Sequence, residues 1–260
     1  MPGSDLALLI EAAQEAGRIA TRYVGQPLDV RDKADGSGPV TAADLAVNAM
    51  LTEHLRAARP DYGWLSEETE DDFTRLEAER VFIVDPIDGT RSFIEGSATW
   101  AHSLAVADHG VVTSAVIYLP QRGKLYTAAM GQGADLNGTP IHATTRSDLS
   151  GASVMAASSN FDPERWCAGQ VPQVTRGFRP SLAYRLSLVA EGRYDAMLTL
   201  RSTWEWDIAA GDLILREAGA ISTDRCAQAL RFNNPQPFVN GMIAANPVLH
   251  RALHRALAPG

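Results

Sequence analysis

A short apolar run, residues 81–84, leads directly into the sequence Asp85-Pro86-Ile87-Asp88-Gly89-Thr90. Such a run is typical of a buried strand, and carboxylates at its end are the hard oxygen ligands that Mg²⁺ prefers. Pro86 fixes its own φ and biases the residue before it toward an extended backbone, so the two carboxylates need not point the same way. Gly89 permits a tight turn, and Thr90 can begin a helix whose free amides favour an anion. The segment therefore predicts a strand that stops after residue 84 and presents a cation and phosphate site.

Composition restricts the class of protein. The chain has 260 residues, 45% of them hydrophobic, which is enough for one large α/β unit or two smaller halves. A formal charge of −8 disfavours direct binding of nucleic acid or of anionic membrane. Cys167 and Cys226 are the only cysteines, which favours a reducing, cytoplasmic setting. The opening apolar run has no basic flank, so we expect the start of a helix rather than a leader, and we expect no membrane span.

The hydrophobic pattern predicts an alternation of helices and strands. The stretch 31–39 is rich in helix breakers and is expected to be a mobile loop, and residues 103–141 are expected to form antiparallel hairpins. Helices are expected over residues 6–24, 41–59, 163–168, 182–191, 207–218 and 247–257, and further strands over 62–65, 81–84, 154–157 and 195–200. The pattern changes near residue 150. We therefore expect a boundary between two parts of the chain, 1–150 and 151–260.

Two further segments place acids at element ends. Ser66-Glu67-Glu68-Thr69 follows one predicted strand, so Glu67 can sit beside the end of its neighbour. The sequence Trp206-Asp207-Ile208-Ala209-Ala210-Gly211 places Asp207 at a helix start, followed by small residues that allow close packing. Carboxylates from three separate segments are what a pair of metal ions requires, because such a site needs both bridging and terminal oxygen ligands.

The combination resembles the inositol monophosphatase family of lithium-sensitive, magnesium-dependent phosphomonoesterases. The resemblance covers nearly the whole chain. Its two anchors are the segments 85–90 and 206–211, supported by Ser-Glu-Glu at 66–68 and Val-Thr-Ala-Ala-Asp at 40–44. It implies a layered αβαβα sandwich, with an N-terminal α+β half, 1–150, that carries most of the metal ligands and a C-terminal α/β half, 151–260, that completes the site. It also implies two or three Mg²⁺ ions with Mn²⁺ as a possible substitute, inhibition by Li⁺, a homodimer, and a small phosphorylated metabolite as substrate.

The resemblance also implies a role for individual residues. Metal ligands would be Glu67, Asp85, the main-chain carbonyl of Ile87, Asp88 and Asp207, with Asp85 shared between two ions. Asp44 and Thr90, together with Glu67, would orient and deprotonate a metal-activated water for in-line attack on phosphorus. The substrate would meet Lys33, Gly89, Thr90, Arg91, Arg185 and Arg201.

Several of these residues have a simpler interpretation. Asp44 completes the capping-box pattern that begins at Thr41, so it can be a helix cap, and both roles can hold together. Glu68 is expected to be a solvated acid or a group behind the ligands. Glu205 is expected at the surface or facing the substrate. Tryptophans such as Trp100 and Trp204 are more often packing residues than stacking platforms.

Substrate identity is harder to predict than reaction type. Inositol-specific members usually carry a glutamate seven residues before the second-site aspartate, where this chain has Leu200. The Asp-Gly-Thr-Arg-Ser-Phe run at 88–93 and the basic residue Arg185 before Leu-Val-Ala-Glu-Gly resemble the CysQ-like 3′(2′),5′-bisphosphate nucleotidases. Arg185 and Arg201 could then meet a second phosphate, or could be ordinary surface arginines. Inositol-1-monophosphatase and histidinol-phosphate phosphatase are the alternatives, and a binding protein of the extragenic-suppressor type is the alternative from another class.

Overall fold

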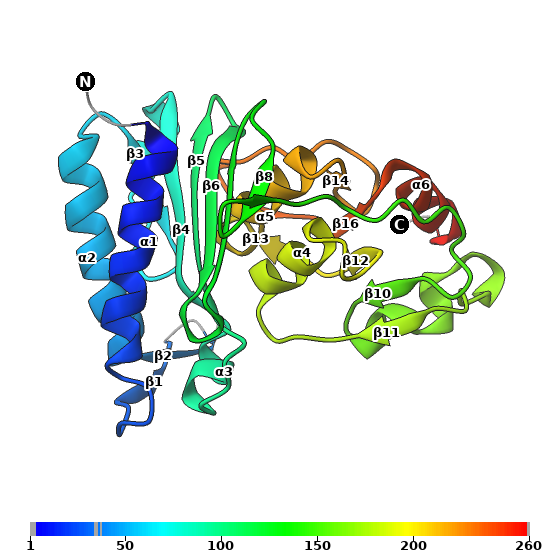
Figure 1. Cartoon of the computed structure of the whole chain (residues 1–260), viewed down its shortest axis with the longest axis horizontal. Helices are drawn as coiled ribbons and strands as arrows, with labels where there is room; N and C mark the ends of the chain where they lie inside the picture. Colours follow the sequence, from blue (N-terminus) through cyan, green and yellow to red (C-terminus); the bar gives the residue numbers. More distant parts are fainter. Residues whose placement is uncertain (1–3, 34–35, 37, 259–260) are drawn as a thin grey trace.

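The computed structural model describes residues 4–33, 36 and 38–258, which form five layers (Figure 1). Helices α1 (Asp5–Thr21) and α2 (Ala42–Ala58) make the first layer, and a seven-stranded sheet makes the second. Helices α4 (Leu182–Ala190) and α5 (Glu205–Glu217) lie between this sheet and a five-stranded sheet, and α6 (Pro247–Ala256) covers the far side. The αβαβα sandwich predicted from the sequence is confirmed.

The seven-stranded sheet contains the strands expected around the acidic motif. Its order is that of the chain: β3 (Gly63–Ser66), β4 (Arg80–Asp88), β5 (Ala101–Asp108), β6 (Val111–Leu119), β7 (Lys124–Ala129), β8 (Ala134–Leu136) and β9 (Thr139–Pro140). β3 and β4 are parallel, and every later neighbour is antiparallel. The predicted hairpins are therefore present. Asn137 and Gly138 form the last turn with φ of 52° and 75°, as residues that tolerate the left-handed region do.

The five-stranded sheet has the order β11 (Thr175–Gly177), β10 (Ser153–Met155), β12 (Ala196–Thr199), β16 (Met242–Ala245) and β14 (Ile221–Thr223). β10 is parallel to both of its neighbours, and β16 is antiparallel to both of its own. The strands predicted at 154–157 and 195–200 are present as β10 and β12. Both are shorter than predicted, and β10 begins one residue earlier.

The helix predicted over 163–168 is wrong. The chain forms separate 3₁₀ turns at Pro163–Arg165 and Cys167–Gly169, and Trp166 between them has an extended backbone. Trp166 is buried and makes a β-bridge with Leu257. The tertiary contact of this side chain fixes the backbone in a conformation that local sequence could not indicate.

The alternation along β4 explains why its apolar run is continuous. Phe82 and Val84 pack against α1 and α2, whereas Val81 and Ile83 face the core that contains α4 and α5. Because the sheet is covered on both faces, successive residues must both be apolar. The five-stranded sheet is covered in the same way, with α6 over its outer face.

The two N-terminal helices follow their predicted bounds closely. Ser4 caps α1, and Thr41 caps α2 with a capping box whose partner is Asp44. The prediction of a mobile loop over 31–39 is wrong at both ends of this stretch. There, β1 (Val30–Asp32) and β2 (Pro39–Thr41) pair in an antiparallel ribbon. Positions 34–35 and 37, at the centre of that prediction, lie outside the described residues. Of the helices that the structure describes, none is long and apolar enough to cross a membrane.

Close contact between α4 and α5 depends on Gly211. A Cβ atom built at this position would lie 2.8 Å from the Cβ of Leu186. We expect Gly211→Ala to lower the free energy of unfolding by about 1–3 kcal/mol, because overpacking between fixed helices outweighs the ~1 kcal/mol by which alanine favours a helix. Urea unfolding followed by circular dichroism measures this, with Glu11→Ala on the exposed face of α1 as the control. Equal or higher stability of Gly211→Ala would contradict the packing argument.

Candidate active site

The acidic motif lies inside β4 and not after it. The strand continues to Asp88, and its pairing with β5 shifts between Asp85, opposite Ser103, and Asp88, opposite Ala101. Two residues of β4 therefore face one residue of β5, which is a β-bulge. In a regular strand, positions 85 and 88 would point to opposite faces. The bulge removes this difference in orientation. The prediction that the strand stops after residue 84 is therefore wrong: the strand continues to Asp88, and its bulge brings both carboxylates to one side.

His102 is the residue of β5 opposite the bulge. Its ring is fully buried, and burial lowers its pKa to about 4, so the ring is neutral near pH 7. Because the carbonyl of Pro86 can only accept, the Nδ1–H of His102 donates the hydrogen bond between them. Sequence analysis did not identify His102, because only the register of β5 against β4 brings it to the motif.

Three carboxylates meet beside the bulge. One oxygen each from Asp85, Asp88 and Asp207 lies within 4.8 Å of the others, with Asp207 supplied by the first turn of α5. Asp85 is 1% exposed, and its buried Oδ1 has no hydrogen-bond partner among the described residues. Burial, followed by repulsion from Glu67 and the other acids, raises the pKa of Asp85 well above its usual range, and burial with the charge of Asp88 does the same for Asp207. Buried like charges are costly without a cation, so the donor set fits Mg²⁺.

The N-terminus of α4 holds one of these acids in place. Ser181 Oγ and the amide of Ala183 both donate to Asp88 Oδ2, at 2.7 and 2.6 Å. Ser181 also caps the helix by accepting from the amide of Tyr184. Burial raises the pKa of Asp88 to about 6, and these hydrogen bonds limit the rise. Ser181 was missed from the sequence, although its place just before the apolar helical run is a capping signal.

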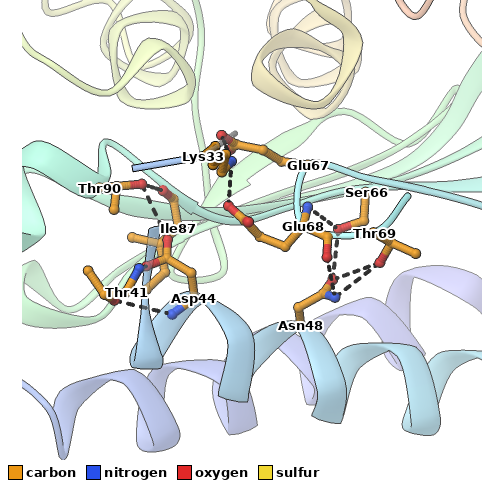
Figure 2. Close-up of polar contacts among 10 residues, drawn as sticks. All are labelled: Lys33, Thr41, Asp44, Asn48, Ser66, Glu67, Glu68, Thr69, Ile87 and Thr90. Atoms are coloured by element: carbon orange, nitrogen blue, oxygen red, sulfur yellow. Dashed lines mark hydrogen bonds and ion pairs between the residues drawn. The ribbon is translucent and has the colours of Figure 1, made fainter. Parts of the chain in front are cut away.

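Glu67 approaches the cluster from the end of β3. Its amide donates to the carbonyl of Val84, and its carboxylate is 2.7 Å from Lys33 Nζ (Figure 2). Lys33 is also 2.7 Å from Glu68, so it is placed between two carboxylates rather than free to meet a phosphate. The Glu68 side chain is 5% exposed, and burial raises its pKa to about 7 despite the lysine. Glu68 is therefore not a solvated acid and lies behind Glu67.

Asp44 and Thr90 are brought together although they are 46 residues apart in the sequence. Thr90 Oγ1 lies 3.3 Å from Asp44 Oδ1 and 3.2 Å from the carbonyl of Ile87 (Figure 2). Asp44 Oδ2 accepts from the amide of Thr41 at 2.9 Å as part of the capping box. Burial raises the pKa of Asp44. Asp44 thus completes the capping box, and its second oxygen faces Thr90, whereas its catalytic role stays a prediction.

A cavity of about 590 Å³ opens over the carboxylates. Gly89, with φ of 94°, and Thr90 lie on its wall at the start of α3 (Thr90–Ile94), and exposed Arg91 follows them. All six residues predicted to meet the substrate line this cavity: Lys33, Gly89, Thr90, Arg91, Arg185 and Arg201. Among the predicted metal ligands, Glu67, Asp85, Asp88 and Asp207 line it as well.

A second cavity of about 280 Å³ shares Phe178, Arg185 and Arg201 with the first. Arg185 is 7% exposed and donates to the carbonyls of Arg179 and Pro180, while its guanidinium lies 4.3 Å from the ring centroid of Phe178. Burial lowers its pKa to about 10, so it remains charged at pH 7. Within the described part of the chain, neither Arg185 nor Arg201 is ion-paired to a carboxylate.

The expectation for Glu205, the first residue of α5, is wrong. Glu205 is fully buried, and its carboxylate accepts from the amides of Asn233 and Asn234 and from Asn234 Nδ2 at 2.6–2.9 Å. It therefore fastens the helix start to a distant loop and faces neither solvent nor substrate. Trp204 packs against the rings of Trp206 and Phe238, yet it is 40% exposed and lines the larger cavity, whereas Trp100 is buried as expected.

Comparisons with known proteins agree with this geometry. Residues 4–259 match the model of the inositol monophosphatase family. Over 229 residues, the chain is 34% identical to the inositol-1-monophosphatase of Rhizobium meliloti (strain 1021), covering 84% of this chain and 85% of the relative. Over 228 residues, it is 32% identical to the Nus factor SuhB of Escherichia coli (strain K12), covering 84% of each. The crystal structure of extragenic suppressor protein suhB from Bartonella henselae superposes with a TM-score of 0.81, 30% identity and 98% coverage of each chain.

The chain therefore belongs to the inositol monophosphatase family. This is a family of magnesium-dependent phosphatases, so the protein is a phosphoric monoester hydrolase. The three relatives named above are an inositol-1-monophosphatase and two suhB proteins. The CysQ-like branch expected from the sequence stays a prediction.

The carboxylate cluster predicts an unusual pH dependence of stability in metal-free protein. The folded-state pKa of Asp88, about 6, lies above the ordinary value near 3.8, so ionisation of Asp88 lowers the free energy of unfolding. The full loss applies above pH 6, and no loss applies below pH 4. Asp88→Asn should therefore raise the free energy of unfolding by about 1–3 kcal/mol at pH 8 with EDTA present, and this gain should vanish near pH 4. Both hydrogen bonds to Asp88 reach the same oxygen, which an asparagine carbonyl can replace.

Urea unfolding at both pH values measures this difference. Asp61→Asn, at an exposed position, is the matched control. Added Mg²⁺ should stabilise wild type more than Asp88→Asn, because the variant has one ligand charge fewer. Lower stability of Asp88→Asn at pH 8 in EDTA would show that repulsion within the cluster is not a cost to the fold.

Proposed function

We propose that the protein hydrolyses a small metabolite that carries a second anionic group besides the phosphate that is removed, and that 3′-phosphoadenosine 5′-phosphate is the substrate best matched to the site. The observation that carries the proposal is the pair Arg185 and Arg201. Both line the cavity above the carboxylates and the smaller cavity beside it, without a carboxylate partner among the described residues. A phosphate placed there would be bound by charge-assisted hydrogen bonds from guanidinium groups.

Glu67, Asp85, the carbonyl of Ile87, Asp88 and Asp207 are the residues that would hold Mg²⁺. The bound cations would neutralise charge on the phosphate and make a water molecule more acidic. Thr90 Oγ1 has a single proton and two acceptors, Asp44 and Ile87 O, so its lone pairs are free to accept from that water. Asp44, with its raised pKa, is suited to receive the proton. The amides at Gly89 and Thr90 lie at the start of α3 on the same wall.

Lys33 requires a rearrangement in this mechanism. Its ammonium is 2.7 Å from Glu67, which is one of the proposed metal ligands. A cation bound by Glu67 would repel the ammonium and release it toward the phosphate. This movement reconciles the ion pair in the structure with the role predicted from the sequence.

Two other substrates are tested alongside the bisphosphate. Inositol 1-phosphate is favoured by the Rhizobium meliloti relative, and it is disfavoured by Leu200, an apolar residue at the position where inositol-specific members have a glutamate. Histidinol phosphate fits the run Asp-Gly-Thr-basic-x-Phe at 88–93. Steady-state kcat/KM for the three compounds on one preparation decides among them, and a preference for either alternative would overturn the bisphosphate assignment.

Arg201→Ala should reduce the preference for the bisphosphate. Loss of a guanidinium–phosphate contact should lower kcat/KM for 3′-phosphoadenosine 5′-phosphate about 10- to 100-fold relative to kcat/KM for inositol 1-phosphate. Arg251→Ala, on the exposed side of α6, is the control for loss of one positive charge. An unchanged ratio of the two kcat/KM values would remove Arg201 from substrate recognition.

The number of metal ions and the response to lithium belong to the same proposal. We infer two or three Mg²⁺ ions during turnover, with Li⁺ inhibiting by replacing one of them. Activity should be lost in EDTA and restored by Mg²⁺ or Mn²⁺. A lithium titration at fixed Mg²⁺ would contradict the inference if the rate did not change.

A second candidate comes from a different class of function. The Escherichia coli relative is called a Nus factor, which favours a role through protein contacts. The formal charge of −8 disfavours direct binding to RNA. Asp88→Asn separates the two functions: a phenotype that persists in cells when hydrolysis is abolished supports the binding role, and a phenotype lost with hydrolysis supports the phosphatase role.

A further inference from the structure

Three aromatic residues form a cluster beside the active-site cavity, and two of them, Trp204 and Trp206, line it. The rings of Trp204 and Trp206 are stacked, with centroids 4.8 Å apart and planes 9° from parallel. Phe238 meets Trp204 edge-on at 5.7 Å. The contact with Phe238 is a cross-strand pair, because β13 (Thr203–Trp204) is antiparallel to β15 (Phe238–Val239) and places these two residues opposite each other. The conformation of Trp204 is therefore fixed from two sides.

The backbone beneath the cluster is held as firmly as the rings. Glu205, between the two tryptophans, is fully buried and accepts three hydrogen bonds from Asn233 and Asn234. Asn234 also accepts, through its carbonyl, from the buried guanidinium of Arg75. Trp204 is nevertheless 40% exposed, and it lines the cavity. A rigid, exposed indole at a cavity wall binds a flat partner with little loss of side-chain entropy.

The short segment 201–207 brings three kinds of chemistry to one cavity. Arg201 supplies a cation, Trp204 an aromatic surface and Asp207 a carboxylate of the cluster, and all three line the same space of about 590 Å³. A substrate whose phosphate lies at the carboxylate cluster can therefore reach the indole with another part of its structure. A planar heterocycle can stack its whole face on the indole, whereas a polyol has no flat π surface to stack.

We propose that Trp204, supported by Trp206 and Phe238, is a specificity-determining residue on which a heteroaromatic ring of the substrate stacks. The substrate class is thus a phosphate ester of a nucleoside or of a similar compound with a planar heterocycle. This inference rests on the proposed phosphatase function, but not on the second anionic group. The ring would contribute to binding whether the substrate carries one phosphate or two.

The test compares substrates with and without a ring. We would measure kcat and KM for adenosine 3′-monophosphate and for β-glycerophosphate with wild type, Trp204→Ala and Trp204→Phe. Loss of the indole should lower the ratio of the two kcat/KM values about tenfold, chiefly through KM for the adenosine compound, which is the size expected for one stacking contact. Trp204→Phe should restore most of the ratio because it keeps an aromatic surface. An unchanged ratio, or equal losses for both substrates, would overturn the proposal.

A binding measurement keeps the test independent of catalysis. Calorimetric titration of adenosine 3′-monophosphate in the presence of Mg²⁺ should give a Kd about tenfold weaker for Trp204→Ala than for wild type. If no phosphate ester is hydrolysed but this difference is found, the proposed function fails and the stacking site stands. If Arg201→Ala has no effect on the bisphosphate but the ratio still falls in Trp204→Ala, only the second-anion proposal fails.

A competing explanation is that the cluster joins two copies of this chain. Sedimentation of wild type and Trp204→Ala at the same concentration tests it. Dissociation of an oligomer in the variant, with no change in the ratio of kcat/KM values or in Kd, would assign the aromatic cluster to an interface and overturn the stacking proposal.

Discussion

The approach of buried Asp85 and Asp88 and half-buried Asp207 to within 4.8 Å of one another is the interaction on which the rest of the structure depends. Carboxylates in such a site repel each other and lose hydration, so the polypeptide needs a strong scaffold to hold them and a cation to offset their charge. The scaffold comes from three elements: the bulged end of β4, the N-terminus of α4 and the first turn of α5. A cation bound there would offset the repulsion among the acids, so its binding would stabilise the fold.

The middle helical layer connects the two sheets to this centre. Ser181 links the start of α4 to Asp88, and Gly211 lets α5 pack close to α4. Glu205 attaches the start of α5 to the loop around Asn234. These three contacts lie outside the cavity, yet they fix the positions of two carboxylates in it. Local sequence near each acid explains only part of its geometry.

The two ends of the larger cavity come from different parts of the chain. Glu67, Asp85, Asp88, Gly89 and Thr90 lie within the first 90 residues, whereas Asp207 comes from α5. Arg185, Arg201, Phe178 and Trp204 come from the C-terminal part, where two cavities share a wall. The proposed second-anion and ring contacts therefore use residues of the C-terminal part other than the carboxylate cluster. The division of the chain near residue 150 stays a prediction, although each sheet lies on one side of it.

The sequence by itself determined most element types, most helix bounds, the layered fold and the family, because apolar periodicity and the segments 85–90 and 206–211 are local properties of the chain. The six residues predicted to meet the substrate, and four of the five predicted metal ligands, line the larger cavity, while their roles stay predictions. Only the tertiary structure decided orientation and burial. The bulge that turns Asp85 and Asp88 toward one side depends on the register of β5 and on His102, and the exposure of Trp204 and burial of Glu205 depend on β15 and Asn234. Such properties arise from contacts between segments distant in sequence, and no pattern within one segment encodes them.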